Sequence, residues 1–229
     1  MAFARYLAMT AEEFSSAPSL PEKIAWMACH FSPYSTSLLN LPRSLPEASL
    51  LILNDSTPPV HQDCKNVAKI IEATLKEQKC SGLLLDFQHR DCPQNKEIAQ
   101  ALTGLDFPVC APEYLAKELD CSVFLPPPPP DMPLREYIKP WQGRDIWLEA
   151  ALSCRQIKVT DSGSYLRPVS GDPECPLADT ALHCHYGIEK DNDGFIFTLK
   201  RTREDLDSLL AEAEALGITA AVGLYQELK

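Results

Sequence analysis

Long apolar runs are absent from this sequence. No uninterrupted apolar segment approaches the ~18 residues that a helix needs to span a bilayer. The first nine residues lack the basic start and the long apolar centre of a secretory signal peptide, and Glu12 and Glu13 follow closely. We therefore expect neither a membrane span nor a signal peptide.

Motifs that hold metals or nucleotides are also missing. The nine cysteines are scattered and include no Cys-x-x-Cys pair, which disfavours a structural zinc site. Their odd number disfavours a disulfide framework, so we expect reduced thiols and a cytoplasmic location. Neither a phosphate-binding loop nor a Gly-x-Gly-x-x-Gly motif is present. The sequence therefore predicts no cofactor and no metal.

Basic charge is scarce. The 229 residues include 21 Lys and Arg against 32 Asp and Glu, so the formal net charge is -11. The only compact basic run lies at residues 200–203. These features disfavour a nucleic acid or an anionic membrane as a partner. With 45% hydrophobic residues, the chain suffices for one large domain or two small ones.

Expected strands and helices alternate along most of the chain, which is typical of parallel βα units. Residues 1–22 are expected to form an N-terminal arm with a short helix capped by Thr10. A first strand is expected at 23–31, and the apolar spacing over 61–78 predicts an amphipathic helix. Further strands are expected at 50–53, 107–110, 121–125, 145–150 and 218–225, and further helices at 95–105, 112–119, 133–141 and 202–216.

Two kinds of segment interrupt this alternation. A polar turn predicts a hairpin of strands 156–160 and 164–168, and a second pair of strands is expected at 181–186 and 194–199. Pro126–Pro130 is a run of five prolines, which must be extended and cannot donate backbone hydrogen bonds. We interpret this run as a stiff loop after a strand, and a ligand for a Pro-recognising domain is the alternative.

The stretch Ser81-Gly82-Leu83-Leu84-Leu85-Asp86-Phe87-Gln88 has the pattern of a buried parallel strand with polar groups at its C-terminal end. Because side chains alternate along a strand, Asp86 and Gln88 are expected to project from one face. The stretch resembles the fourth-strand signature of family 18 glycoside hydrolases, the chitinase-like barrels, which is Asp-Gly-x-Asp-x-Asp-x-Glu. An ordinary buried strand of an α/β protein is the alternative reading of the same residues.

Gly82 and Asp86 match that signature, and Ser81, Leu84 and Gln88 depart from it where the family carries acids. The family's final Glu is the general acid that protonates the leaving oxygen. The resemblance therefore implies that Gln88 stands in the place of the catalytic acid and that catalysis is impaired. Loss of a general acid typically lowers the rate by about 10² to 10⁴-fold.

The C-terminal part, 194–226, also resembles the family, whose members often end with a helix and a last strand carrying an aromatic residue on the floor of the sugar site. Tyr225 would hold that place. The resemblance implies an α/β fold, a compact or irregular (β/α)₈ TIM-like barrel with an inserted β-hairpin. We expect residues 23–229 to form this single barrel domain.

Acids near expected strand ends supply candidates for catalysis. Asp86, with Gln88 as the degenerate acid, could form a carboxylate pair with Glu149 or Glu227 for glycoside hydrolysis. The candidates for substrate binding are Asn54, Asp55, Trp147 and Tyr225.

Two further constellations have simpler interpretations. His183 and His185 could hold a metal from one strand face, but no third ligand is identifiable, and we favour satisfied or exposed histidines. Cys29 beside His30, and Cys110, are possible nucleophiles, which we interpret as core thiols because no partner arrangement is visible.

Three functions follow from these observations. The first is a glycoside-hydrolase-like protein with impaired catalysis that binds a saccharide at the C-terminal ends of the strands. The second is an active glycosidase that uses Asp86 with another carboxylate, and the third is a non-catalytic interaction scaffold. A saccharide is the expected partner, and the sequence identifies no protein partner.

Overall fold

The computed structural model describes residues 3–32, 34–35, 37–57, 63–169 and 171–229. The chain divides into two compact units. The first, here called the barrel unit, comprises residues 1–125, 143–148 and 219–229, and the second, the insert unit, comprises 126–142 and 149–218. Each is described by itself.

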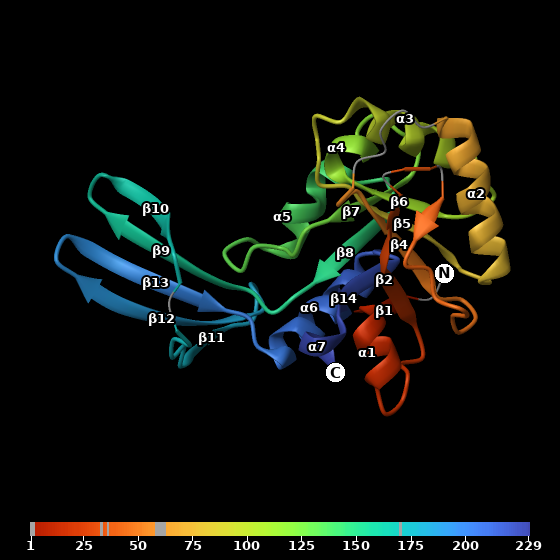
Figure 1. Ribbon diagram of the computed structural model, residues 1–229. Helices are drawn as coiled ribbons and strands as arrows, with labels where there is room; N and C mark the ends of the chain where they lie inside the picture. The colour runs from red at the N-terminus through yellow and green to blue at the C-terminus, as the bar shows by residue number, and fades with distance from the viewer. Residues whose placement is uncertain (1–2, 33, 36, 58–62, 170) are drawn as a thin grey trace. The chain divides into compact units, whose positions relative to one another are not determined.

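The barrel unit is built on eight parallel strands that close into a barrel (Figure 1). In spatial order these strands are β1 (Ala4–Met9), β2 (Ile24–Phe31), β4 (Leu50–Asn54), β5 (Gly82–Asp86), β6 (Val109–Pro112), β7 (Ser122–Leu125), β8 (Ile146–Ala150, with 146–148 in this unit) and β14 (Ala220–Leu224). The barrel closes because β1 pairs in parallel with both β14 and β2. A two-residue strand, β3 (Leu38–Leu39), adds to β2 in the antiparallel sense. The predicted TIM-like barrel is confirmed.

The helices of the barrel unit each follow one of its strands along the chain. They are α1 (Ala11–Ser16), α2 (Cys64–Glu77), α3 (Pro93–Leu102), α4 (Glu113–Ala116) and the short α7 (Tyr225–Leu228). Thr10 caps α1 in a capping box with Glu13, as predicted. The apolar faces of α2, α3 and α4 pack with the outward residues of β4, β5 and β6 in one buried cluster (Figure 1).

The alternation along β5 places the predicted motif. Leu83, Leu85 and Phe87 lie in the cluster beneath the helices, whereas Leu84 lies in the cluster that fills the barrel. Gly82 is required by close packing, since a Cβ atom there would lie 2.9 Å from the carbonyl oxygen of Pro108. Asp86 therefore falls on the inner face, at the C-terminal end of a strand flanked by β4 and β6.

The structure differs from the prediction at the N-terminus. Residues 4–9, within the segment expected to be an arm, form β1, so the first barrel strand precedes the expected one at 23–31. The partners of β1 are β2 and, from the far end of the chain, β14. A short strand whose main partner is some 200 residues away has no local signal in the sequence.

The insert unit is organised around a five-stranded antiparallel sheet in the order β10-β9-β13-β12-β11. Its elements are α5 (Leu134–Ile138), a 3₁₀ turn at Lys139–Trp141, β9 (Cys154–Thr160), β10 (Gly163–Arg167), β11 (Leu177–Asp179), β12 (Cys184–Asp191), β13 (Gly194–Lys200) and α6 (Arg203–Ala215). Both predicted hairpins are present, and the pairing of β9 with β13 joins them. The insertion is therefore a whole sheet and larger than the predicted hairpin.

The proline run, Pro126–Pro130, supplies hydrogen-bond acceptors within the insert unit. The carbonyl oxygen of Pro126 accepts from the Tyr137 hydroxyl at 2.9 Å. That of Pro128 accepts from the guanidinium of Arg201 at 2.8 Å, and that of Pro130 from the thiol of Cys184 at 3.4 Å. These contacts fit the interpretation of the run as a structural loop.

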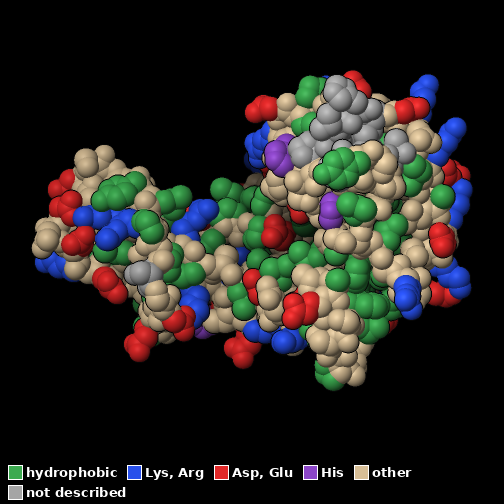
Figure 2. Space-filling model, viewed as in Figure 1, with side chains coloured by type: hydrophobic (Ala, Val, Ile, Leu, Met, Phe, Trp, Pro, Cys, Tyr) green, Lys and Arg blue, Asp and Glu red, His purple; other side chains and the backbone are tan. Residues whose placement is uncertain are grey.

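Charge is mixed on the face of the molecule that Figure 2 shows. On the face shown in Figure 2, acidic and basic side chains alternate over the described residues without forming a continuous basic patch. Within the described part of the chain, no helix is both long and apolar enough to cross a membrane.

Candidate functional site

The candidate site lies at the C-terminal ends of β4 and β5. Asn54 and Asp86, the last residues of these strands, are paired in register. Asp86 is half-buried and Gln88 is exposed, and the Gln88 Nε2 group donates a hydrogen bond to Oδ1 of Asp86. The carboxylate and the amide that the sequence predicted to project together are therefore in direct contact.

The carboxyl group of Asp86 has an altered acidity. Burial raises the pKa of Asp86 above its usual value, and the nearby charge of Asp55 raises it further. The hydrogen bond from Gln88 opposes both effects, because it favours the ionised form. The net result is a carboxyl group that holds its proton to a higher pH than an exposed aspartate.

Asp55 has a different environment and role. It is 1% exposed, and its carboxylate accepts hydrogen bonds from the backbone N–H groups of Gln88 at 2.8 Å and His89 at 2.9 Å. Asn95 Nδ2 donates to it at 2.6 Å, and His89 Nδ1 lies 3.1 Å away. Burial alone would raise the pKa of Asp55, but these hydrogen bonds outweigh it and lower the pKa. Asp55 is thus an ionised anchor that holds the loop between β5 and α3.

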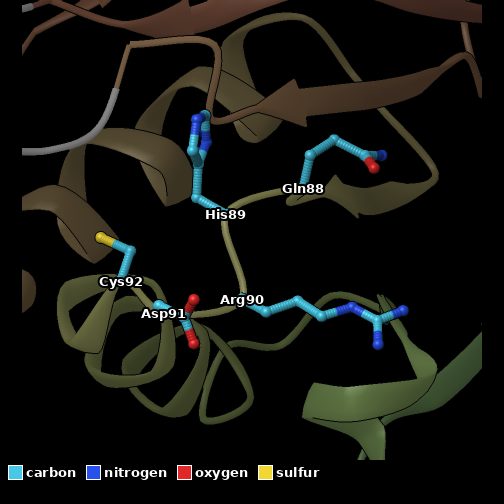
Figure 3. A pocket seen from close by; sticks show the side chains of 5 residues that line it. All are labelled: Gln88, His89, Arg90, Asp91 and Cys92. Carbon is cyan, nitrogen blue, oxygen red and sulfur yellow. The ribbon is translucent and has the colours of Figure 1, made fainter.

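The anchored loop lines a surface hollow of about 550 Å³, formed by residues 88–92 (Figure 3). Tyr114, at the start of α4, supports it: its hydroxyl donates to the carbonyl oxygen of Phe87 at 3.3 Å. The guanidinium of Arg90 lies 5.5 Å from the centre of the Tyr114 ring. Figure 3 shows Gln88 and Arg90 extending to the same side of the loop, while His89 and Cys92 extend to the other.

Asn54, predicted to bind substrate, makes hydrogen bonds to the backbone. Its Nδ2 group donates to the carbonyl oxygens of Cys29 at 3.1 Å and Met27 at 3.4 Å, and its Oδ1 accepts from the N–H group of Ser56 at 3.1 Å. Asn54 and Asp55 therefore lie beside Asp86, and their polar atoms shape the backbone around it.

Trp147 fills the interior of the barrel. Its indole N–H donates to Asp145 at 3.2 Å, just before β8 begins, and its ring stacks with Tyr6 at 6.3 Å. The Tyr6 hydroxyl lies 3.1 Å from Oγ of Ser81, just before β5 begins. The polar groups of both aromatic side chains thus point to the N-terminal ends of the strands, opposite to Asp86.

The remaining predicted residues lie in other elements. Tyr225 and Glu227 are in α7, which follows the C-terminal end of β14, and so lie at the same end of the barrel as Asp86. The Lys229 ammonium group lies 5.4 Å from the Tyr225 ring centre. Glu149 is the fourth residue of β8, is half-buried, and belongs to the insert unit.

Three residues of the site were not among the predicted ones: His89, Arg90 and Tyr114. All follow the C-terminal ends of barrel strands, where the active-site loops of this fold lie. Their place directly after the expected strands was the feature of the sequence that could have identified them as site residues. Which of these loop residues turn toward Asp86 depends on the Asp55 anchor, which the sequence does not reveal.

The histidine pair and the candidate nucleophilic cysteines have structural roles. His183 lies 2.7 Å from Glu212, and His185 lies 2.8 Å from Asp205, so the two imidazoles have separate partners. No group of three metal-ligating side chains is found among the described residues. Burial raises the pKa of the Cys29 thiol to about 12 and also raises that of Cys110, which makes both poor nucleophiles.

Solved structures share this fold. A family 18 chitinase from Cycas revoluta in complex with (GlcNAc)3 superposes with a TM-score of 0.56 at 10% identity, over 96% of this chain and 94% of that one. A chitinase-like agglutinin from Robinia pseudoacacia superposes with a TM-score of 0.57 at 12% identity, over 98% of this chain and 95% of that one. The spore cortex-lytic enzyme of Bacillus cereus superposes with a TM-score of 0.54 at 10% identity, over 97% of this chain and 70% of that one. No family model matches the sequence, and no curated protein shows significant similarity to it.

The predicted resemblance to family 18 glycoside hydrolases is therefore confirmed for the fold. At these identities the similarity extends to the architecture alone. The degenerate signature on β5 occupies the fourth strand of the barrel, counted along the chain from β1.

Proposed function

We propose that this protein is a glycoside-hydrolase-like barrel with impaired catalysis, which binds a saccharide at the C-terminal ends of its strands. The observation that carries the proposal is the Asp86–Gln88 contact at the end of β5. An amide stands in direct contact with the carboxyl group, at the position where the family signature has its acid. Because an amide has no titrating proton, it cannot protonate a leaving group.

The same pair retains the means to bind a sugar. Gln88 is exposed, and an amide both donates and accepts hydrogen bonds, as sugar hydroxyl and acetamido groups require. The chitinase with the same fold was solved with bound (GlcNAc)3, and the agglutinin is chitinase-like. These neighbours support N-acetylglucosamine oligomers as the first compounds to test.

Titration calorimetry with (GlcNAc)4, followed by product analysis after prolonged incubation, tests the proposal. Binding without turnover is the expected result. Turnover would contradict the impairment, and the absence of both binding and turnover would favour the interaction scaffold. Asp86→Ala is the matched variant, because it removes the central carboxylate from an otherwise intact loop and is expected to weaken binding.

An active glycosidase is the second candidate, and the raised pKa of Asp86 favours it. A carboxyl group that keeps its proton to higher pH is suited to act as a general acid. In that case hydrolysis would decline as Asp86 ionises with rising pH, and Asp86→Asn would abolish it. A pH–rate profile of wild-type protein and this variant distinguishes the two candidates.

A further inference from the structure

The residues that line the hollow at Gln88 include a cationic side chain, that of Arg90. Arg90 is exposed, its guanidinium lies over the Tyr114 ring, and none of the described carboxylates forms an ion pair with it. The electron-rich face of the ring attracts the cation and favours this position of the side chain. The guanidinium carries a planar fork of N–H donors that matches the geometry of a carboxylate.

Hydrogen bonds hold the backbone of the loop that carries Arg90. Asp55 binds the N–H groups of Gln88 and His89, and Asn95 Nδ2 donates to the carbonyl oxygen of His89 at 3.2 Å. The N–H group of Arg90 itself donates to the carbonyl oxygen of Gln88 at 3.1 Å. A ligand that meets this loop therefore has little ordering entropy to overcome.

The neighbouring charges leave the Arg90 side open to an anion. Asp55 is buried with His89 as its partner, and Asp86 is bonded to Gln88. Asp91 lines the same hollow, and Figure 3 shows it on the side of the loop opposite to the Arg90 guanidinium. Figure 3 shows the Gln88 and Arg90 side chains extending to the same side of the loop, so one extended saccharide on that side could meet both.

We infer that Arg90 makes this site selective for saccharides that carry a carboxylate, such as a uronic acid, over neutral ones of the same length. This inference rests on the proposed saccharide binding and adds the class of ligand. Gln88 and Asp86 meet the hydroxyl or acetamido groups, and Arg90 binds the carboxylate through two parallel N–H···O bonds.

Calorimetric titration with two N-acetylated tetrasaccharides tests the inference: neutral (GlcNAc)4 and the hyaluronan tetrasaccharide, which carries carboxylates. The wild-type protein is expected to bind the hyaluronan fragment about tenfold more tightly, since a hydrogen bond to a charged group is worth roughly one factor of ten. Arg90→Gln should remove this preference and leave the affinity for (GlcNAc)4 within about twofold. Arg90→Lys should keep part of it, because the charge remains while the fork is lost.

Arg43→Gln is the matched control. Arg43 is also exposed, but it lies in the loop that leads into β4, toward the opposite end of the barrel, and its replacement should change neither affinity. Equal affinity of the wild-type protein for the two sugars, or an equal loss for both in Arg90→Gln, would overturn the inference. Binding of (GlcNAc)4 alone would overturn the inference and leave the proposed function standing, whereas binding of neither sugar would overturn both.

Discussion

At the scale of single residues, the site contains two aspartates with opposite responses to pH. Burial raises the pKa of Asp86, whereas the hydrogen bonds to Asp55 outweigh its burial and lower its pKa. The stabilising contribution of Asp55 is present above the unfolded-state value near 3.8 and is lost as the pH falls through its lower folded pKa. The contribution of Asp86 is present below that value and is lost as the pH rises through its higher folded pKa. Near neutral pH, Asp86 therefore lowers the stability of the fold.

Replacement of Asp86 by Asn should raise the melting temperature at pH 7. Asn retains an Oδ1 acceptor for the Gln88 amide and removes the cost of a buried charge. The gain should shrink as the pH is lowered, and it should vanish below about pH 3, where the wild-type carboxyl is protonated in both the folded and the unfolded state. Melting curves of both proteins across this pH range provide the measurement. The control is Asp91→Asn in the same loop, because Asp91 is exposed and its change should stay within about 0.5 kcal/mol.

Gln88→Glu tests whether the missing acid alone impairs catalysis. The new carboxyl would touch Asp86, and two carboxyls in contact share a proton, which raises the pKa of one of them. If Gln88 is the only defect, hydrolysis of (GlcNAc)4 should appear or increase by up to about 10² to 10⁴-fold, with the greatest rate at acidic pH. Reducing-end assays give the rate. Sugar binding without any gain in turnover would show that Gln88 is not the only defect.

The triple change Ser81→Asp, Leu84→Asp, Gln88→Glu would restore all three acids of the family signature, but it is a poor test of function. Leu84 is 2% exposed inside the barrel among apolar side chains, and an aspartate there would lack a hydrogen-bonding partner. We expect that change to unfold much of the protein. Circular dichroism of the single and triple variants would distinguish loss of fold from loss of function.

At the scale of elements, the insert unit is held by a buried arginine that bonds to backbone carbonyl groups. Arg201 is 1% exposed and donates to the carbonyl oxygens of Pro128, Leu182 and His183 and to the hydroxyl of Ser153. It thus joins the proline run to the turn before β12 and to the residue before β9. The run has acceptors only, because proline lacks an N–H group, and Arg201 supplies donors.

Arg201→Ala should destabilise the insert unit by roughly 3 kcal/mol, because buried carbonyl groups would lose their donors and a cavity would remain. Chemical denaturation followed by circular dichroism measures the change. Arg203→Ala is the control on the same segment. Its 4.0 Å ion pair with Asp207 is half-exposed, so its loss should cost no more than about 0.5 kcal/mol. Equal losses in the two variants would contradict the role of Arg201.

At the scale of the whole molecule, the number of free thiols reports on the redox state, and the reactivity of each thiol reports on its burial. All nine cysteines are free in the structure; Cys29, Cys80, Cys110 and Cys184 are buried, and Cys154 is exposed. Burial raises the pKa of the Cys80 and Cys184 thiols to about 11, which suppresses the reactive thiolate.

Titration of the unfolded protein without reductant should therefore count nine thiols. In the native protein Cys154 should react first and the four buried thiols last, because access and thiolate fraction both favour Cys154. Mass spectrometry after timed alkylation identifies the order. A count of one in the unfolded protein would instead indicate four disulfides, and the predicted cytoplasmic location would lose its support.

The sequence by itself determined those features that depend on neighbours along the chain. The alternation of expected strands and helices predicted parallel βα units, and the resemblance of the 81–88 stretch to a family signature implied the barrel. The Gly82–Gln88 pattern located the central strand and its polar end, and the Thr10 cap marked a helix start. Each of these signals depends on the spacing of residues within a short segment, and this spacing can be seen in the sequence without knowledge of the rest of the fold.

Only the tertiary structure decided which distant groups meet. It made residues 4–9 a barrel strand, joined the two hairpins into one sheet, and stacked Trp147 on Tyr6 inside the barrel. It also placed Asp55 beneath the loop that carries Arg90, with Tyr114 beside it. These outcomes depend on burial and on hydrogen bonds between residues tens to hundreds of positions apart, and such pairings leave no periodic pattern in the sequence.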